Sequence, residues 1–162
     1  MYDQYLKVQP SKIGMGVFTT ITIPANVPIY EVTGEIYTEE SAPNPKDPNL
    51  LQIGPNQFIS SPGGFCDFTN HSCNPNCTMH IIGNRAILYS LYVIPAGAEL
   101  TFDYSTSSTD TLEKWSMNCL CNSVNCRKVI SGFHLLNEET QQDLKNKGMV
   151  PLFMTNPIFI RK

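Results

Sequence analysis

Residues 68–76 read Phe68-Thr69-Asn70-His71-Ser72-Cys73-Asn74-Pro75-Asn76, a polar stretch rich in turn-forming residues. The sequence on either side, from Leu6 to about Tyr104, consists of short apolar runs broken by Gly, Pro and Asn, and such runs predict β-strands. Taken alone, an Asn-His pair in such a turn is more often engaged in local hydrogen bonds than in binding. A binding role for this stretch can therefore be inferred only together with other parts of the sequence.

The strand pattern continues on both sides of this stretch. Residues 77–82 and 85–90 flank Gly83-Asn84, a pair suited to the positive φ of a tight turn, so we expect a β-hairpin there. Prolines at 43, 45 and 48 leave room only for a surface loop, after which the strand pattern resumes at Leu50. The chain up to Tyr104 thus predicts one mainly β domain.

The composition changes after Tyr104. A Ser- and Thr-rich connector over residues 105–111 leads into a cysteine-dense stretch that ends near Cys126. Further on, Asn137 can cap a helix, acidic residues follow it, and Gly148 can end it. We therefore expect one short helix near the C-terminus.

Three of the six cysteines lie close together in this tail. Cys119, Cys121 and Cys126 provide three sulfurs within eight positions. In a chain without a signal peptide, such cysteines are more naturally metal ligands than disulfide partners. Three sulfurs are one ligand short of a closed tetrahedral zinc site, so the fourth ligand must come from elsewhere.

Several residues compete to be the fourth ligand. Cys73 is the best donor because it lies in the polar stretch rather than in a strand, but His134 and His80 are alternatives. Cys66 and Cys77 are expected to be small core residues.

Length and charge limit the possible functions. With 162 residues, of which 41% are hydrophobic, the chain can form one domain with its own core. The formal net charge of −3 argues against direct nucleic-acid binding, including that of a zinc ribbon, and favours a basic partner. The sequence contains neither a signal peptide nor a run of about 18 apolar residues. We expect an intracellular protein without a membrane span, in cytoplasm or nucleus, and the sequence predicts no oligomeric state.

Three separated stretches resemble one known family. They are Gly14-Met15-Gly16-Val17-Phe18, residues 68–76, and Gly97-Ala98-Glu99-Leu100-Thr101-Phe102-Asp103-Tyr104. In this order they resemble the SET-domain protein lysine methyltransferases, and the tail cysteines resemble the post-SET motif of the same family. The resemblance covers roughly residues 5–133. It implies a SET domain over residues 1–110, a post-SET zinc motif over 111–133 and a C-terminal helical extension over 134–162.

The resemblance also implies the fold and the metal site. The fold is expected to consist of small curved sheets, in which the segments around Asn70 and Tyr104 pass one another in a knot-like crossing. One structural zinc would then join that crossing to the tail, with ligands Cys73, Cys119, Cys121 and Cys126.

The family's cofactor is S-adenosylmethionine, and its substrate is a protein that presents a lysine. By resemblance, Tyr104 is the main catalytic residue, and Phe102 limits how many methyl groups the acceptor nitrogen can take. The residues expected to bind the cofactor are Gly14, Met15, Gly16, Asn70, His71, Tyr104, Ile130 and Phe133, the last two as tail residues that cover the adenine.

The chain departs from the family pattern at several positions. Asp67 and Asn49 stand where Arg and Tyr are usual, Val32 replaces a second Tyr, and Lys128 replaces a Gly. Asp67 and Asn49 favour a rival hypothesis, a catalytically idle SET-like protein-binding module with a structural zinc. Intact Asn70, His71 and Tyr104 favour an enzyme, for which a histone is one candidate substrate.

Overall fold

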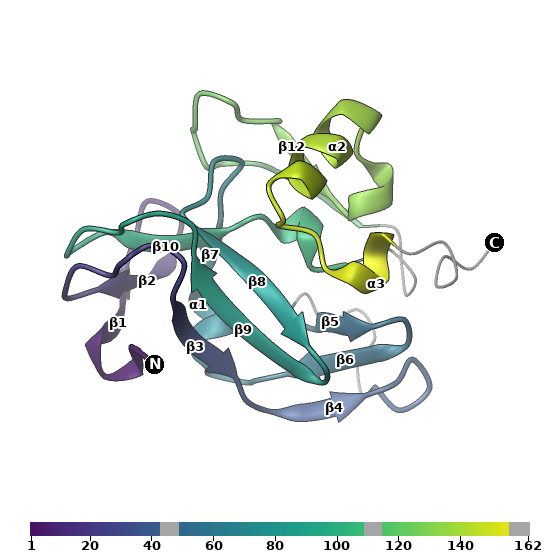
Figure 1. Ribbon diagram of the computed structural model, residues 1–162, viewed down its shortest axis with the longest axis horizontal. Coiled ribbons are helices and arrows are strands. Elements are labelled where there is room, and N and C mark those ends of the chain that lie inside the picture. The colour runs from purple at the N-terminus through teal and green to yellow at the C-terminus, as the bar shows by residue number, and fades with distance from the viewer. Residues whose placement is uncertain (43–48, 109–114, 156–162) are drawn as a thin grey trace.

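The computed structural model describes residues 1–42, 49–108 and 115–155 (Figure 1). The strands are β1 (Leu6–Pro10), β2 (Met15–Thr19), β3 (Pro28–Val32), β4 (Glu35–Tyr37), β5 (Leu51–Gly54), β6 (Gln57–Ser60), β7 (Asn70–His71), β8 (Cys77–Ile82), β9 (Arg85–Ser90), β10 (Glu99–Phe102), β11 (Ser116–Asn118) and β12 (Val129–Ser131). The helices are α1 (Phe65–Phe68), α2 (Glu138–Asn146) and α3 (Leu152–Thr155). The prolines at 43, 45 and 48 and the expected boundary at residue 110 lie outside the described residues.

The described strands form four small sheets. Their orders are β1-β2-β10-β7, β3-β9-β8, β4-β6-β5 and β11-β12. This arrangement confirms the predicted mainly β fold of small sheets. Figure 1 shows the β8-β9 hairpin in the middle of the molecule and α2, α3 and β12 together on one side of it.

The predicted hairpin is confirmed. Strands β8 and β9 pair from Cys77 opposite Ser90 to Ile82 opposite Arg85. Gly83 in the turn has a φ of 61°, a conformation that costs glycine little because it has no Cβ.

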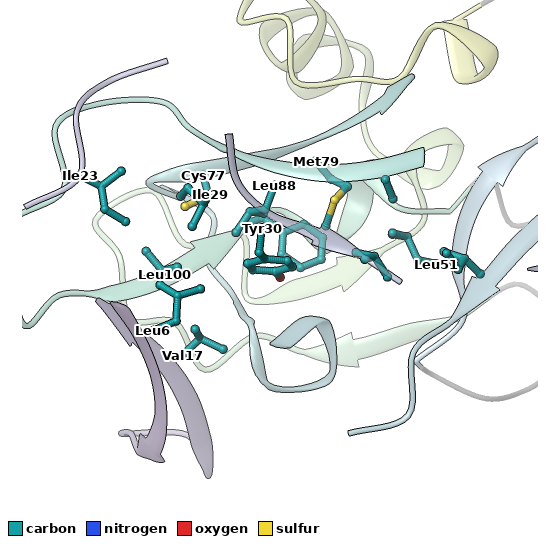
Figure 2. Packing of buried hydrophobic residues seen from close by; sticks show 14 of the residues in the cluster. Leu6, Val17, Ile23, Ile29, Tyr30, Leu51, Cys77, Met79, Leu88 and Leu100 are labelled. Carbon is teal, nitrogen blue, oxygen red and sulfur yellow. The ribbon is translucent and has the colours of Figure 1, made fainter. Parts of the chain in front are cut away.

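The main core lies where β2, β3, β8, β9 and β10 meet. Its fully buried side chains include Val17, Tyr30, Met79, Leu88 and Leu100. Figure 2 shows Tyr30 in the middle of this cluster. Because the core draws on strands from β1 to β10, the N-terminal part of the chain is held together by apolar burial across sheets.

A second, smaller core lies under the C-terminal helices. Phe133, Leu144, Met149 and Met154 are buried there, and Leu91 packs against them. The helix expected in this region is α2: the Asn137 side chain accepts the Thr140 N–H at 2.8 Å. The four-residue helices α1 and α3 were not expected, since neither is long enough to show an apolar period. In the described part of the chain, no helix could cross a membrane.

One pairing brings distant segments together. Strand β7 pairs in parallel with β10, so that Asn70 lies opposite Thr101 and His71 opposite Phe102. The Ser72 N–H also donates to the Phe102 carbonyl at 3.1 Å. The polar stretch and the strand that leads into Tyr104 therefore lie side by side, as the resemblance implied. The threading of one segment past the other stays a prediction.

Candidate active site and metal centre

The Asn70 side chain lies at the junction of three segments. Its amide nitrogen Nδ2 is 2.7 Å from Glu99 Oε1, 2.9 Å from the Met15 carbonyl and 3.2 Å from Ser11 Oγ. A Cβ at residue 16 would overlap the Glu99 carboxylate, so a larger residue there would displace that carboxylate from Asn70. The structure thus brings the Gly16 segment, Asn70 and the start of β10 to one place.

The turn before Gly16 has the conformation that the motif requires. Gly14 has a φ of 77°, and its carbonyl accepts the Ser11 N–H at 2.8 Å. This turn directs the Met15 carbonyl toward Asn70. The backbone from Gly14 to Gly16 therefore lies beside the Asn70 amide.

Tyr104 lies directly after this junction. Its hydroxyl donates to the Thr69 carbonyl at 2.9 Å, and its ring centroid is 5.4 Å from that of His71. Burial, with smaller contributions from Cys66 and Glu99, raises the pKa of the Tyr104 phenol well above its ordinary value. The hydroxyl is therefore a neutral donor at physiological pH.

Phe102 is 4% exposed and belongs to the main core. Its ring centroid lies 5.0 Å from that of Tyr104. The residue expected to limit methylation thus neighbours the expected catalytic tyrosine.

Sequence reasoning missed a second tyrosine near this point. Tyr30 is 1% exposed and its hydroxyl lies 2.8 Å from Thr69 Oγ1, while Thr69 Oγ1 itself donates to the Phe65 carbonyl. Tyr30 is therefore the donor in the first bond. The Tyr30 hydroxyl donates to the Thr69 hydroxyl, and the Tyr104 hydroxyl donates to the Thr69 carbonyl. An aromatic residue inside a buried strand carries no sequence signal that separates it from ordinary core.

The structure gathers four possible metal ligands. Ligand atoms of His71, Cys73, Cys119 and Cys121 all lie within 4.8 Å of one another, with 3.7 Å between the Cys73 and Cys119 sulfurs. The Cys126 thiol also contacts that of Cys119. Either four thiols or three thiols with one imidazole form a tetrahedral donor set that suits zinc.

His71 competes with Cys126 for the fourth ligand position, and its hydrogen bonds bear on the choice. The Tyr104 N–H donates to His71 Nδ1 at 3.1 Å, so in the neutral ring the proton is on Nε2. Burial lowers the pKa of His71 to about 4, against the opposing effect of Asp103, which keeps the ring neutral. The Nε2–H faces Cys73 Sγ at 3.3 Å. A ring nitrogen that donates to the Cys73 sulfur supports the metal site without binding the ion, and this favours Cys126 as ligand.

The two histidines considered from sequence lie elsewhere. His80 stacks on Tyr89 at 4.6 Å between ring centroids, and His134 packs against Phe133. Neither contributes to the group of close ligand atoms found among the described residues.

The cysteines differ in ionisation. Burial raises the pKa of Cys66 and of Cys77 to about 12, so both are neutral thiols that contact the core. Burial also acts on Cys121, but hydrogen bonds from the Cys73 backbone and Ser123 outweigh it and lower the pKa of Cys121 to about 6. A thiolate is the form that binds a metal.

The two tail residues expected over the adenine are both buried. Ile130, in β12, is 3% exposed, and Phe133 is 1% exposed within the second core. Lys145 of α2 lies over the Phe133 ring, 5.6 Å from its centroid. Their role toward a cofactor stays a prediction.

The structure gives Asp67 a local role and shows whether Val32 and Asn49 are buried. Asp67 accepts the Gly63 N–H at 2.8 Å and so closes the turn before α1, in which Gly63 has a φ of 75°. Val32 is 4% exposed and belongs to the main core, and Asn49 is exposed.

Sequence reasoning also missed Asn76, the last residue of the polar stretch. Its Nδ2 donates to the Glu99 carbonyl at 2.8 Å, and its Oδ1 accepts the Thr101 N–H at 2.9 Å. Asn76 thereby fixes β10 against the stretch that contains Asn70. Its position in the same polar stretch was the available signal.

The sequence profile of the SET domain family matches residues 14–105. The match covers more than half of the chain, and the protein belongs to the SET-domain family.

Curated relatives extend this result. The chain is 33% identical over 133 residues to the histone-lysine N-methyltransferase ash1 of Drosophila melanogaster, a match that covers 74% of this chain and 6% of that protein. It is 30% identical over 152 residues to an H3 lysine-36 specific histone-lysine N-methyltransferase of Cryptococcus neoformans, covering 85% of this chain and 18% of that protein. The chain therefore spans only a small part of these relatives.

Two solved structures are similar to this chain in fold. KRYPTONITE in complex with mCHG DNA and SAH superposes with a TM-score of 0.62 at 28% identity, covering 76% of this chain and 28% of that one. A second complex of KRYPTONITE, with mCHH DNA, an H3(1-15) peptide and SAH, gives a TM-score of 0.62 at 27% identity, covering 77% and 29%.

Proposed function

We propose that this chain is an S-adenosylmethionine-dependent protein lysine N-methyltransferase. The observation that carries the proposal is the parallel pairing of β7 with β10, which brings Asn70, His71 and Tyr104 together in a SET domain. Solved relatives of this fold are described as complexes with SAH, and the named curated relatives are histone-lysine N-methyltransferases.

The chemistry needs little from the protein beyond positioning. S-adenosylmethionine supplies a methyl group that is already activated, so the protein must align the acceptor nitrogen and exclude water. Lysine is charged at neutral pH, with an ordinary pKa of about 10.4, and an apolar channel favours its neutral form. Tyr104 provides a neutral hydroxyl beside the apolar ring of Phe102. We assign Tyr104 as the main catalytic residue on this basis.

The cofactor residues follow from the same junction. The Asn70 amide donates to the Met15 carbonyl and to Glu99, which leaves its Oδ1 as an acceptor for a cationic amino group. We assign Gly14, Met15, Gly16, Asn70 and His71 to the methionine part of the cofactor.

We assign one structural zinc to Cys73, Cys119, Cys121 and Cys126. The ion would hold the tail against the segment that contains His71, and it takes no part in methyl transfer. The close sulfurs and the lowered pKa of Cys121 support this assignment.

The proposed substrate is a histone, with H3 as the first candidate. One solved relative is described with an H3 peptide, and a curated relative is specific for an H3 lysine. The net charge of −3 suits a basic tail and does not suit direct binding of nucleic acid. A histone substrate would place the action of the chain in the nucleus, and another basic protein could place it in the cytoplasm.

The rival proposal, an idle binding module, rests on Asp67 and Asn49. Asp67 accepts a hydrogen bond from the Gly63 N–H, so this departure from the family pattern has a structural role in a local turn. Because His71 and Tyr104 contact each other, and Asn70 contacts Met15 and Glu99 at the adjacent junction, we favour the enzyme.

Isothermal titration calorimetry with S-adenosylhomocysteine tests cofactor recognition. We expect one molecule bound per chain, and weaker binding in Asn70→Ala by at least about tenfold because a hydrogen-bonded contact to a charged group is lost. Asn146→Ala on the exposed side of α2 serves as the matched control. Absence of binding to the wild-type chain would contradict the proposal. Incubation of lysate with labelled S-adenosylmethionine, followed by mass spectrometry, then identifies the modified protein.

A further inference from the structure

A buried ion pair joins the tail to the residue that precedes Tyr104. Asp103 is 0% exposed and receives two hydrogen bonds from the Arg127 guanidinium, Nη2 to Oδ1 at 2.6 Å and Nη1 to Oδ2 at 2.7 Å. The Arg127 side chain is itself only 17% exposed. Arg127 follows Cys126 directly in the chain, just as Asp103 precedes Tyr104.

Both partners are tied further into their surroundings. On the tail side, the Arg127 N–H donates to Cys73 Sγ at 3.4 Å. On the other side, Asp103 Oδ1 accepts the Ser105 N–H at 3.0 Å, and Arg127 Nη2 donates to Ser105 Oγ at 3.1 Å. The pair therefore holds the residues before and after Tyr104, while the backbone of Arg127 contacts the cysteine cluster.

The energetics make this link specific. A bidentate guanidinium-carboxylate pair fixes orientation as well as distance, and removing one partner leaves a buried charge without compensation. A tail that moves away would uncover Asp103, so the docked tail and the ordered turn at Tyr104 are expected to occur together.

We propose that Arg127 is a positioning residue that acts through Asp103 to hold the Tyr104 hydroxyl in its productive place. The inference rests on the proposed methyltransferase function. It assigns to the tail a role in the rate of transfer, beyond its role in closing the fold. The alternative is that the ion pair is a structural tie that contributes stability alone.

A double-mutant cycle with Tyr104 separates these two roles. Single-turnover transfer from S-adenosylmethionine to recombinant histone H3 is measured with enzyme in excess, for Arg127→Gln alone, Tyr104→Phe alone and both together. We expect Arg127→Gln to slow transfer about a hundredfold, as a displacement of about 1 Å does in other enzymes. In the Tyr104→Phe background the same change should cost less than about threefold, because the hydroxyl it positions is already gone.

Four further measurements complete the test. Zinc content and the dissociation constant of S-adenosylhomocysteine should stay near wild type in Arg127→Gln. Arg127→Lys keeps the positive charge but cannot make the bidentate contact with Asp103, and it should slow transfer by about tenfold. Arg85→Gln is the matched control, because Arg85 makes the same bidentate contact with Glu31 on an exposed surface, and its rate should not change.

An equal loss in both Tyr104 backgrounds would overturn the proposal, as would an unchanged rate in Arg127→Gln. Loss of zinc in both Arg127→Gln and Arg127→Lys would also overturn it, since the pair would then serve the metal fold alone. If the wild-type chain transfers no methyl, the proposed function itself fails. Normal wild-type transfer with an equal loss in both backgrounds contradicts only the role of Arg127.

Discussion

At the scale of single residues, the proposed chemistry of the candidate site rests on two side chains. The Tyr104 hydroxyl is buried, donates to the Thr69 carbonyl and has a raised pKa, so it keeps its proton. Phe102 lies beside it with no polar atom. A neutral donor next to an apolar ring suits the alignment of an uncharged amine better than proton abstraction by a tyrosinate.

The raised pKa of Tyr104 leads to a pH prediction. A phenol with a raised pKa stays neutral until the pH exceeds that pKa, so Tyr104 should cause no loss of activity up to about pH 10. The fraction of neutral substrate lysine rises about tenfold per pH unit below its pKa of about 10.4. We expect kcat/KM for an H3 peptide to rise between pH 7 and pH 9. A fall in this range that disappears in Tyr104→Phe would show that Tyr104 ionises early.

Phe102 leads to a prediction about the product. A second or third methyl needs space beside the acceptor nitrogen, and a tyrosine hydroxyl at position 102 would fill that space. The wild-type chain should therefore reach dimethyl-lysine or trimethyl-lysine, whereas Phe102→Tyr should stop mainly at the first methyl. Mass analysis of an H3 peptide over time measures this. A wild-type chain that halts at one methyl, or an unchanged distribution in Phe102→Tyr, would mean that Phe102 does not face the acceptor.

Some residues of the site followed from the sequence and others did not. Asn70, His71 and Tyr104 stand in recognisable motifs. The structure places His71 against Tyr104, and Asn70 opposite Thr101 in the strand that leads to it. Tyr30 and Asp103 matter through buried partners far away in the chain, Thr69 and Arg127, and a linear pattern does not reveal such partners.

At the scale of elements, the β8-β9 hairpin and α2 followed from local signals, a Gly-Asn turn and an Asn cap. The β7-β10 pairing joins residues 31 positions apart and has two residue pairs, so neither length nor periodicity indicates it. It was expected only through the family resemblance. The short helices α1 and α3 are fixed by tertiary packing and were missed.

The link between the polar stretch and the tail predicts the effect of a cysteine change. Cys73→Ser should lose zinc, release the tail and weaken cofactor binding, because a hydroxyl is a poor zinc ligand. Cys66→Ser and Cys77→Ser should keep the metal, since both thiols are neutral and contact the core. Metal analysis of the purified proteins gives the answer. A full zinc content with intact activity in Cys73→Ser would remove Cys73 from the ligand set.

The packing of Leu144 in the second core leads to a prediction about the stability of α2. Leu144 is 4% exposed and packs with Phe133 in this core, so Leu144→Ala should cost about 2–5 kcal/mol of local stability. Hydrogen exchange of α2 should speed up, while β8 and β9 stay protected. Gln142→Ala on the exposed side of the helix serves as control. Unchanged exchange in Leu144→Ala would mean that the second core does not hold α2 in place.

At the scale of the whole molecule, the chain combines a SET domain with a tail in which Cys119 and Cys121 lie close to Cys73. The mainly β class was predictable because apolar runs and turn residues are local properties. The assembly of the site was not, because it depends on a parallel pairing, a buried ion pair and a sulfur cluster that unite distant segments. The family resemblance indicated the pairing and the sulfur cluster, but it did not indicate the ion pair.

The central claim is that this chain transfers methyl groups to lysine, and intact-mass analysis of histone H3 in reconstituted nucleosomes tests it most directly. Wild-type chain with S-adenosylmethionine should add whole methyl increments to H3, and Tyr104→Phe should slow this by roughly two to four decades, as expected when one positioned polar group is removed. Histones that stay unmodified while the chain binds S-adenosylhomocysteine, or a Tyr104→Phe variant as fast as wild type, would contradict the account.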